Sequence, residues 1–171
     1  MQTDIDRFDP WKLAAAGGQL QGEISMDRMP RFSSLLASPA GPVRFTLEAG
    51  VDAQAITFIS GYLETTVTLV CQRCLAALEL PLQVPVRLGL VGSERQAENL
   101  PEEYDPLVAP AEGVVVAELA EDELILALPL APRHSDVQHC VANGFAPPHA
   151  TAEKAQPFAA LATLMKELRK E

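Results

Sequence analysis

The chain has 171 residues, a formal net charge of −10 at pH 7 and only 5% aromatic residues, so a core must come mostly from Leu, Val and Ala. No stretch approaches the roughly 20 consecutive apolar residues of a membrane-spanning helix, and the first residues are acidic rather than basic and apolar as in a secretory signal. We therefore expect one cytosolic domain over residues 1–171, with no membrane partner and with its three cysteines reduced.

The first part of the sequence predicts strands. Residues 19–26 fit a strand, and residues 29–37 fit a short helix weakened by Pro30. Apolar and polar residues alternate from Val43 to Glu48, as in a half-buried strand. A further run covers 55–59, Gly61 marks a turn after it, and a third strand begins near Leu63.

The clearest strand signal lies between Leu78 and Leu90, where every even position is apolar. One face of this strand should therefore be buried. Pro81 and Pro85 stand at odd positions and cannot donate ladder hydrogen bonds. The strand is thus expected at a sheet edge or interrupted by a bulge.

The second part predicts helices separated by polar segments. Residues 93–112 form an acidic, Pro-rich loop, and residues 116–128 form a helix, a strand being the competing interpretation. The first half of that helix turns Glu118, Glu121 and Asp122 to solvent, and its apolar second half implies deep burial. After the polar, Cys- and His-containing segment 132–156, Pro157 opens a C-terminal helix. These elements predict an α+β fold with an antiparallel β-sheet core, which could close into a barrel-like form, and flanking helices.

Cys71-Gln72-Arg73-Cys74 is the sharpest chemical motif. Two thiolates on such a turn can bind a tetrahedral zinc ion, for which His134, His139 and Cys140 are candidates to complete the ligand set. Two alternatives stay open: a metal-free pair of packed cysteines, and a thioredoxin-like dithiol, which strand-like sequence on both sides of the motif disfavours. The cofactor is therefore none or one structural zinc.

Motifs of catalysis are missing from the sequence. It contains no glycine-rich phosphate loop, no Gly-x-Ser-x-Gly and no His-Glu-x-x-His. A zinc ion held by four protein ligands would leave no coordination position for a substrate. We therefore expect no enzyme and no small-molecule substrate.

Acidic residues are concentrated in one segment. From Glu94 to Glu123 there are ten acidic residues and one basic residue, Arg95. A protein that binds bare nucleic acid normally carries a basic stripe, which this sequence lacks. The segment is either a solvated loop or a surface that binds a basic partner, such as a ribosomal protein. The candidate partner-binding residues are Glu98, Glu102, Glu103, Asp105 and, on the cysteine turn, Arg73.

Several motifs in order resemble one known family. They are the turn 71–74 with the strand after it, residues 100–106, residues 121–129 followed by Pro132, His134 and the His139-Cys140 pair, and the closing residues 156–164. From about residue 40 onward the chain resembles the YceD family, the large ribosomal RNA subunit accumulation proteins. Many relatives carry additional cysteines, arranged like a zinc site, in the region matching 132–149, where this chain has histidines and only Cys140.

The resemblance implies a non-enzymatic role in the synthesis, processing or stability of large-subunit ribosomal RNA. Two mechanisms fit it. In the first, the acidic segment binds a ribosomal protein or an RNA-processing factor, so that contact with ribosomal RNA is indirect. In the second, a zinc-binding protein touches ribosomal RNA directly, with Arg73 contacting a phosphate.

Overall fold

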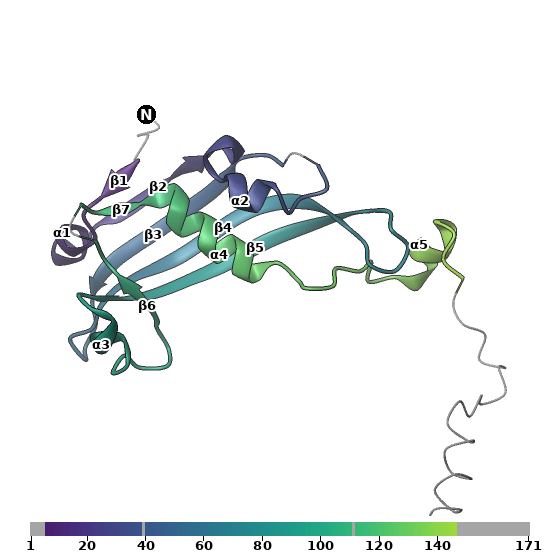
Figure 1. Cartoon of the computed structure of the whole chain (residues 1–171). Coiled ribbons are helices and arrows are strands. Elements are labelled where there is room, and N and C mark those ends of the chain that lie inside the picture. Colours follow the sequence, from purple (N-terminus) through teal and green to yellow (C-terminus); the bar gives the residue numbers. More distant parts are fainter. Residues whose placement is uncertain (1–5, 39, 111, 147–171) are drawn as a thin grey trace, which may run out of the picture.

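A computed structural model of the chain describes residues 6–38, 40–110 and 112–146, and its main feature is a five-stranded β-sheet (Figure 1). In spatial order the strands are β2 (Gln19–Ile24), β3 (Val43–Val51), β4 (Thr57–Val70), β5 (Ala77–Val91) and β6 (Asp105–Val108). Neighbours are antiparallel except β5 and β6, which pair in parallel. The predicted α+β fold with an antiparallel core is confirmed, and the sheet is open, with β2 and β6 as its edges.

Short helices and a second small sheet complete the described fold. The two strands of the small sheet are β1 (Arg7–Phe8) and β7 (Val114–Val115). The helices are α1 (Pro10–Ala15), the 3-10 helix η1 (Met26–Arg28), α2 (Pro30–Ser33), α3 (Glu94–Ala97), α4 (Val116–Ala127) and α5 (Val137–Ala142). None of the helices in the described ranges is long and apolar enough to cross a membrane. The C-terminal helix expected after Pro157 lies outside these ranges.

Alternation of side chains decides which face of the sheet is covered. Val43, Phe45 and Leu47 of β3 are buried, whereas Arg44 and Thr46 between them are exposed. The buried face packs against Phe32 of α2 and against Leu119 and Leu124 of α4 in one hydrophobic core. Figure 1 shows α4 lying along this face beside α2. The sheet therefore has one covered face and one face with polar side chains in solvent.

The long β4–β5 hairpin carries the cysteine motif away from this core. The two strands pair continuously from Phe58↔Gly89 to Val70↔Ala77. Strand β6 pairs only with Leu88–Val91, so Pro81 and Pro85 lie where β5 has β4 as its one described neighbour. Strand β5 is therefore not an edge strand of the sheet as predicted, because β6 follows it, but within the described residues its stretch with Pro81 and Pro85 is paired on one side only, so the prolines interrupt no second ladder.

Gly61 lies inside β4, so the prediction of a turn at this position was wrong. The two apolar runs on either side of it belong to one strand, Thr57–Val70. Gly61 has a φ of +155°, and a Cβ there would overlap the carbonyl oxygen of Thr46 and lie 2.9 Å from the Cα of Leu47. The glycine thus permits a close approach of β3 to β4.

Two polar segments contain more regular structure than expected. Segment 93–112, predicted as a loop, contains α3 and β6, and the described part of segment 132–156 contains α5. Residues Asp105–Val108 form strand β6, which pairs in parallel with Leu88–Val91 at the end of β5. Residues 147–156 lie outside the described ranges.

Helix α4 confirms the helix predicted over this segment, but two of its side chains differ from the prediction in their exposure to solvent. Leu126, expected to be deeply buried, is 81% exposed. Glu121, expected to face solvent, is 3% exposed. Its carboxylate accepts hydrogen bonds from the backbone N–H groups of Arg31 (2.7 Å) and Phe32 (3.0 Å), and pairs with the Arg31 guanidinium at 2.8 Å. The N–H groups at the start of α2, which have no acceptor within their own helix, therefore find one in α4, about 90 residues away.

Candidate metal centre

The turn at the tip of the β4–β5 hairpin presents two cysteines. Cys71 directly follows β4, and its N–H donates to the carbonyl oxygen of Ala76 (2.9 Å). The N–H of Leu75 donates back to the carbonyl oxygen of Cys71 (2.9 Å), and Leu75 has a φ of +61°. This tight turn places Cys71 and Cys74 on the same side of the hairpin tip.

A second segment returns to the same tip after α4. The N–H of Gln72 donates to the carbonyl oxygen of Pro132 (2.7 Å), which ties the returning chain to the turn. Helix α5 then starts after Asp136, whose carboxylate accepts a hydrogen bond from the Gln138 N–H (2.8 Å) and caps the helix. The helix turns Cys140 inward, where its side chain is fully buried.

These segments bring four metal-ligating side chains together: Cys71, Cys74, His134 and Cys140. Their candidate ligand atoms all lie within 4.8 Å of one another. The two sulfurs of Cys71 and Cys140 are 3.9 Å apart, and the Nδ1 atom of His134 is 3.5 Å from the sulfur of Cys74 and 3.7 Å from that of Cys140.

The spacings fit the edges of a zinc tetrahedron. With Zn–S bonds of about 2.3 Å and Zn–N bonds of about 2.0 Å, tetrahedral geometry separates two sulfurs by about 3.8 Å and a sulfur from a nitrogen by about 3.5 Å. The opposite ring nitrogen of His134, Nε2, lies 3.1 Å from the carbonyl oxygen of Ala77. An N–H at Nε2 that donates to this carbonyl leaves the lone pair on Nδ1, which faces the sulfurs. The four residues can therefore hold a metal ion.

The electrostatics of the cluster favour a thiolate. Burial opposes ionisation of Cys71, but backbone N–H groups of His134, Cys74 and Arg73 directed at its sulfur lower its pKa to about 5. Burial raises the pKa of Cys140, and so do its contacts with Cys74 and Cys71. Cys71 would therefore offer a thiolate to a metal at neutral pH, and Cys140 would have to lose its proton to serve as a ligand.

Two other residues considered from the sequence lie beside the cluster without supplying a ligand atom to it. His139 is exposed, and its ring stacks on His134 with centroids 4.6 Å apart. Arg73 is half-buried, and its Nη1 atom lies 3.8 Å from the sulfur of Cys140 and 3.5 Å from the carbonyl oxygen of His134. Spacing along the chain could not distinguish His134 from His139, because only the fold decides which ring meets Cys74.

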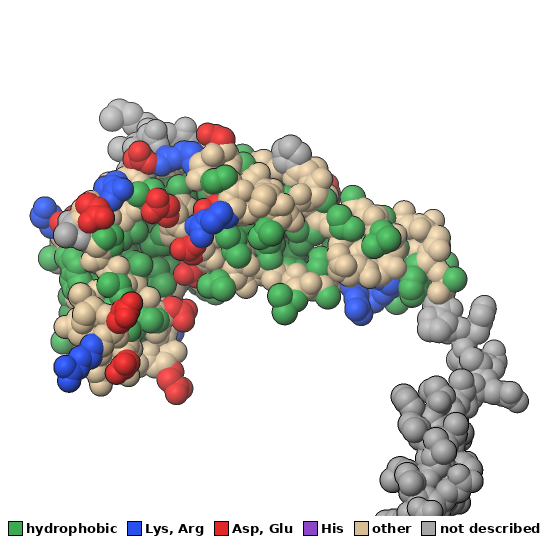
Figure 2. Space-filling model, viewed as in Figure 1, with side chains coloured by type: hydrophobic (Ala, Val, Ile, Leu, Met, Phe, Trp, Pro, Cys, Tyr) green, Lys and Arg blue, Asp and Glu red, His purple; other side chains and the backbone are tan. Residues whose placement is uncertain are grey.

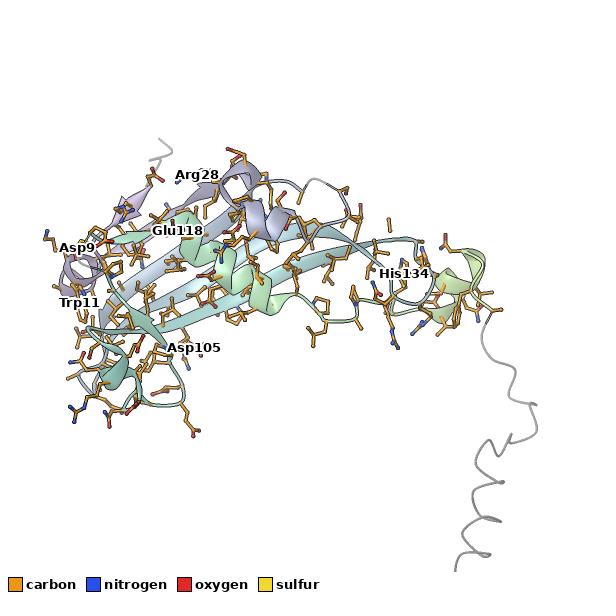
Figure 3. All side chains as sticks on the ribbon, viewed as in Figure 1. Asp9, Trp11, Arg28, Asp105, Glu118 and His134 are labelled. Atoms are coloured by element: carbon orange, nitrogen blue, oxygen red, sulfur yellow. The ribbon has the colours of Figure 1, made fainter. Side chains whose placement is uncertain are left out.

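The candidate partner-binding carboxylates lie at the other end of the molecule. Glu98, Glu102, Glu103 and Asp105 are exposed. Figure 3 shows Asp105 far from His134, and Figure 2 shows acidic side chains gathered toward the end that carries α1 and α3. Burial, followed by the charges of Asp105 and Asp122, raises the pKa of Glu123. The acidic surface therefore extends from β6 onto α4.

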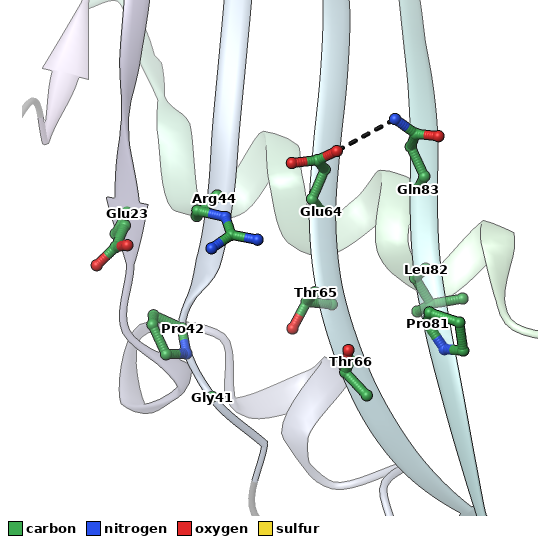
Figure 4. A pocket seen from close by; sticks show the side chains of 10 residues that line it. All are labelled: Glu23, Gly41, Pro42, Arg44, Glu64, Thr65, Thr66, Pro81, Leu82 and Gln83. Carbon is green, nitrogen blue, oxygen red and sulfur yellow. Dashed lines mark hydrogen bonds between the residues drawn. The ribbon is translucent and has the colours of Figure 1, made fainter.

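A third region, on the polar side of the sheet, was not anticipated from the sequence. A groove of about 650 Å³ runs past Arg44, Glu64 and Gln83 (Figure 4), and the Gln83 amide donates to Glu64 at 3.1 Å. Thr65 also lines it, and its hydroxyl is buried with no hydrogen-bond partner among the residues that the structure describes. Charges of both signs line this groove, and none of the candidate metal ligands reaches it.

Two comparisons with known proteins identify one family. Residues 59–165 match the family model described as large ribosomal RNA subunit accumulation protein YceD. A curated relative, the large ribosomal RNA subunit accumulation protein YceD of Haemophilus influenzae, is 32% identical over 162 residues, which cover 91% of this chain and 92% of the relative. No solved structure matches the chain significantly. The family model spans most of the hairpin, the cysteine turn and α4, and the relative aligns with nearly the full chain. The chain therefore belongs to the YceD family.

Proposed function

We propose that this protein promotes the accumulation of large-subunit ribosomal RNA by binding a basic protein partner, without catalysing a reaction itself. The observation that carries the proposal is the similarity of nearly the whole chain to a relative named for large ribosomal RNA subunit accumulation. The proposal sets this activity in the cytosol, where bacterial ribosomes are assembled. It includes no catalytic step, and a metal held by all four clustered side chains would have no open coordination position for a substrate.

The proposed docking surface consists of Glu98, Glu102, Glu103 and Asp105 around α3 and β6. All four side chains are exposed, and Asp105 stands near the carboxylate of Glu123 on α4. Such a surface attracts a basic ribosomal protein or processing factor and repels bare RNA. Contact with ribosomal RNA would therefore pass through the partner.

Deletion of the gene in its own host tests the cellular role. We expect the ratio of mature large-subunit to small-subunit ribosomal RNA to fall, and to recover when the gene is supplied again. An equal loss of both RNAs would contradict a role specific to the large subunit.

Charge reversal tests the docking surface. The variant with Glu98→Lys, Glu102→Lys and Glu103→Lys should fail to restore large-subunit RNA and should lose the salt-sensitive binding of its partner. A matched control with Glu48→Lys, Glu64→Lys and Glu79→Lys changes the net charge equally but lies on strands β3, β4 and β5. If both triple variants behave alike, net charge rather than this surface is responsible.

A second candidate function is zinc binding with direct contact to ribosomal RNA. The specific observation in its favour is the cluster of three cysteines and one histidine at the hairpin tip. Zinc analysis of protein purified without a histidine tag, followed by gel-shift titration with a large-subunit RNA fragment at low salt, tests it. One zinc per chain with submicromolar RNA affinity would favour this function over the first, and one zinc without RNA affinity would make the metal purely structural.

A further inference from the structure

We infer that Arg73 is a positioning residue of the metal centre: it compensates the charge of the ligand set and holds the hairpin turn and the returning segment together. This inference rests on the proposed zinc site. It differs from the sequence-based expectation that Arg73 binds a partner, because its guanidinium is directed at the cluster.

The first argument is the charge of the ligand set. Zn²⁺ bound by three thiolates and one neutral imidazole carries a net charge of −1. Cys71 and Cys140 are fully buried, so this negative charge would lie largely out of water, where an uncompensated charge is costly. A guanidinium stays protonated at all relevant pH values. The Nη1 atom of Arg73, 3.8 Å from the sulfur of Cys140, places that positive charge next to the buried thiolate.

The second argument is connectivity. Arg73 sits in the turn between Cys71 and Cys74, whereas Cys140 is on α5 and His134 precedes it. The same Nη1 atom lies 3.5 Å from the carbonyl oxygen of His134. One side chain thus bridges the turn to both ligands of the returning segment. Residues that orient ligands in this way typically change metal affinity about 10- to 100-fold when they are removed.

The third argument is the contrast with the neighbouring arginine. Arg133 is adjacent to His134, yet its side chain is exposed, whereas Arg73 is half-buried. Arg133 therefore provides a matched control: an arginine in the same region that is not directed at the sulfurs.

The experiment is a competition titration of zinc between a chromophoric chelator and the full-length protein. Arg73→Met keeps the length of the side chain but removes its charge and its donors. We expect it to raise the Kd for zinc about 10- to 100-fold. Arg73→Lys, which keeps the charge but loses the planar fork, should recover part of the affinity. Arg133→Met should match the wild type.

A second readout separates charge compensation from simple structural support. In the zinc-loaded proteins, the reaction rate of the cysteines with an alkylating reagent reports the nucleophilicity of the bound thiolates. Removing the positive donor should make Arg73→Met react several-fold faster than the wild type, and Arg73→Lys should react more slowly than Arg73→Met. Circular dichroism of each variant checks that the sheet, which lies outside the cluster, is folded.

The outcomes are distinguishable. If the wild type binds zinc and Arg73→Met binds it within twofold of the wild type, the role of Arg73 is refuted while the zinc site stands. If affinity falls but alkylation does not accelerate, Arg73 does not compensate thiolate charge. If the wild type binds no zinc, the proposed zinc site fails and this inference fails with it.

Discussion

His134 and Ala77 are joined across the hairpin tip: the Nε2 atom of the imidazole lies 3.1 Å from the Ala77 carbonyl oxygen, and Nδ1 is thereby directed at Cys74 and Cys140. This contact comes from backbone at the start of β5, so the strand itself orients the candidate ligand.

Chelation of zinc should loosen the hairpin tip and leave the sheet folded. Zinc at 100 times its Kd stabilises the state that binds it by about 2.7 kcal/mol. We therefore expect a chelator to accelerate amide hydrogen exchange about 100-fold in residues 132–142, because these contact the rest of the chain mainly at the cluster. Amides of β3 and β4 should be unaffected.

His134→Ala is the matching mutation, with His139→Ala as its control. His139 stacks on His134 but is not among the four clustered residues. His134→Ala should reproduce the chelator pattern without chelator, and His139→Ala should not. Equal effects of the two variants would contradict the assignment of His134 as the ligand.

Replacement of Glu121 should destabilise the fold. Glu121→Ala removes the acceptor of the Arg31 and Phe32 N–H groups at the start of α2. Leaving such donors without a partner costs about 2 kcal/mol, to be measured by urea unfolding. Asp122→Ala is the control, because its carboxylate is 61% exposed and pairs with the same Arg31; its cost should stay below about 1 kcal/mol.

Gly61→Ala should also destabilise the sheet. The added methyl group would overlap the Thr46 carbonyl oxygen, and the φ of +155° is unfavourable for alanine. We expect a loss of about 2 kcal/mol or more. Gly41→Ala adds a methyl group with no atom within 4 Å, so its melting temperature should match that of the wild type. A Gly61→Ala protein as stable as the Gly41→Ala protein would contradict the close packing of β3 on β4.

The hydrogen bonds that the Asp52 carboxylate accepts from Ile56, Tyr104 and Gln54 should make stability depend on pH. The Ile56 N–H lowers the pKa of Asp52 most, burial opposes this, and the Tyr104 hydroxyl (2.9 Å) and the Gln54 N–H lower it further. A carboxyl group with a lower pKa in the folded state stabilises the protein above its unfolded pKa of about 3.9, and this stabilisation is lost as pH falls through the folded value.

Asp52→Asn should therefore lower the melting temperature at pH 7, and the difference from the wild type should shrink as the pH falls below about 4. Tyr104→Phe, which keeps the ring stacked on Phe58 but loses the hydroxyl, should have a smaller effect of the same sign. A difference between Asp52→Asn and wild type that stays constant from pH 7 to pH 3 would show that the charge of Asp52 is not involved.

Local patterns predicted much of the fold. Alternation over Leu78–Leu90 predicted both the strand β5 and its buried face, because strand side chains alternate with period two whatever surrounds them. Periodicity likewise predicted helix α4. It did not reveal that Gly61 continues a strand, since a glycine that permits close backbone approach looks the same in sequence as one that forms a turn.

Tertiary structure alone decided the site and the burial of charge. The sequence by itself determined the chemistry available, namely a Cys-x-x-Cys turn, a distant His and Cys, and an acidic segment. Three features depend on contacts across 60 to 90 residues of chain: the choice of His134 as the histidine near the sulfurs, the position of Arg73 beside Cys140, and the burial of Glu121. Such contacts arise when the hairpin and helices pack against each other, and local residue preferences carry no information about them.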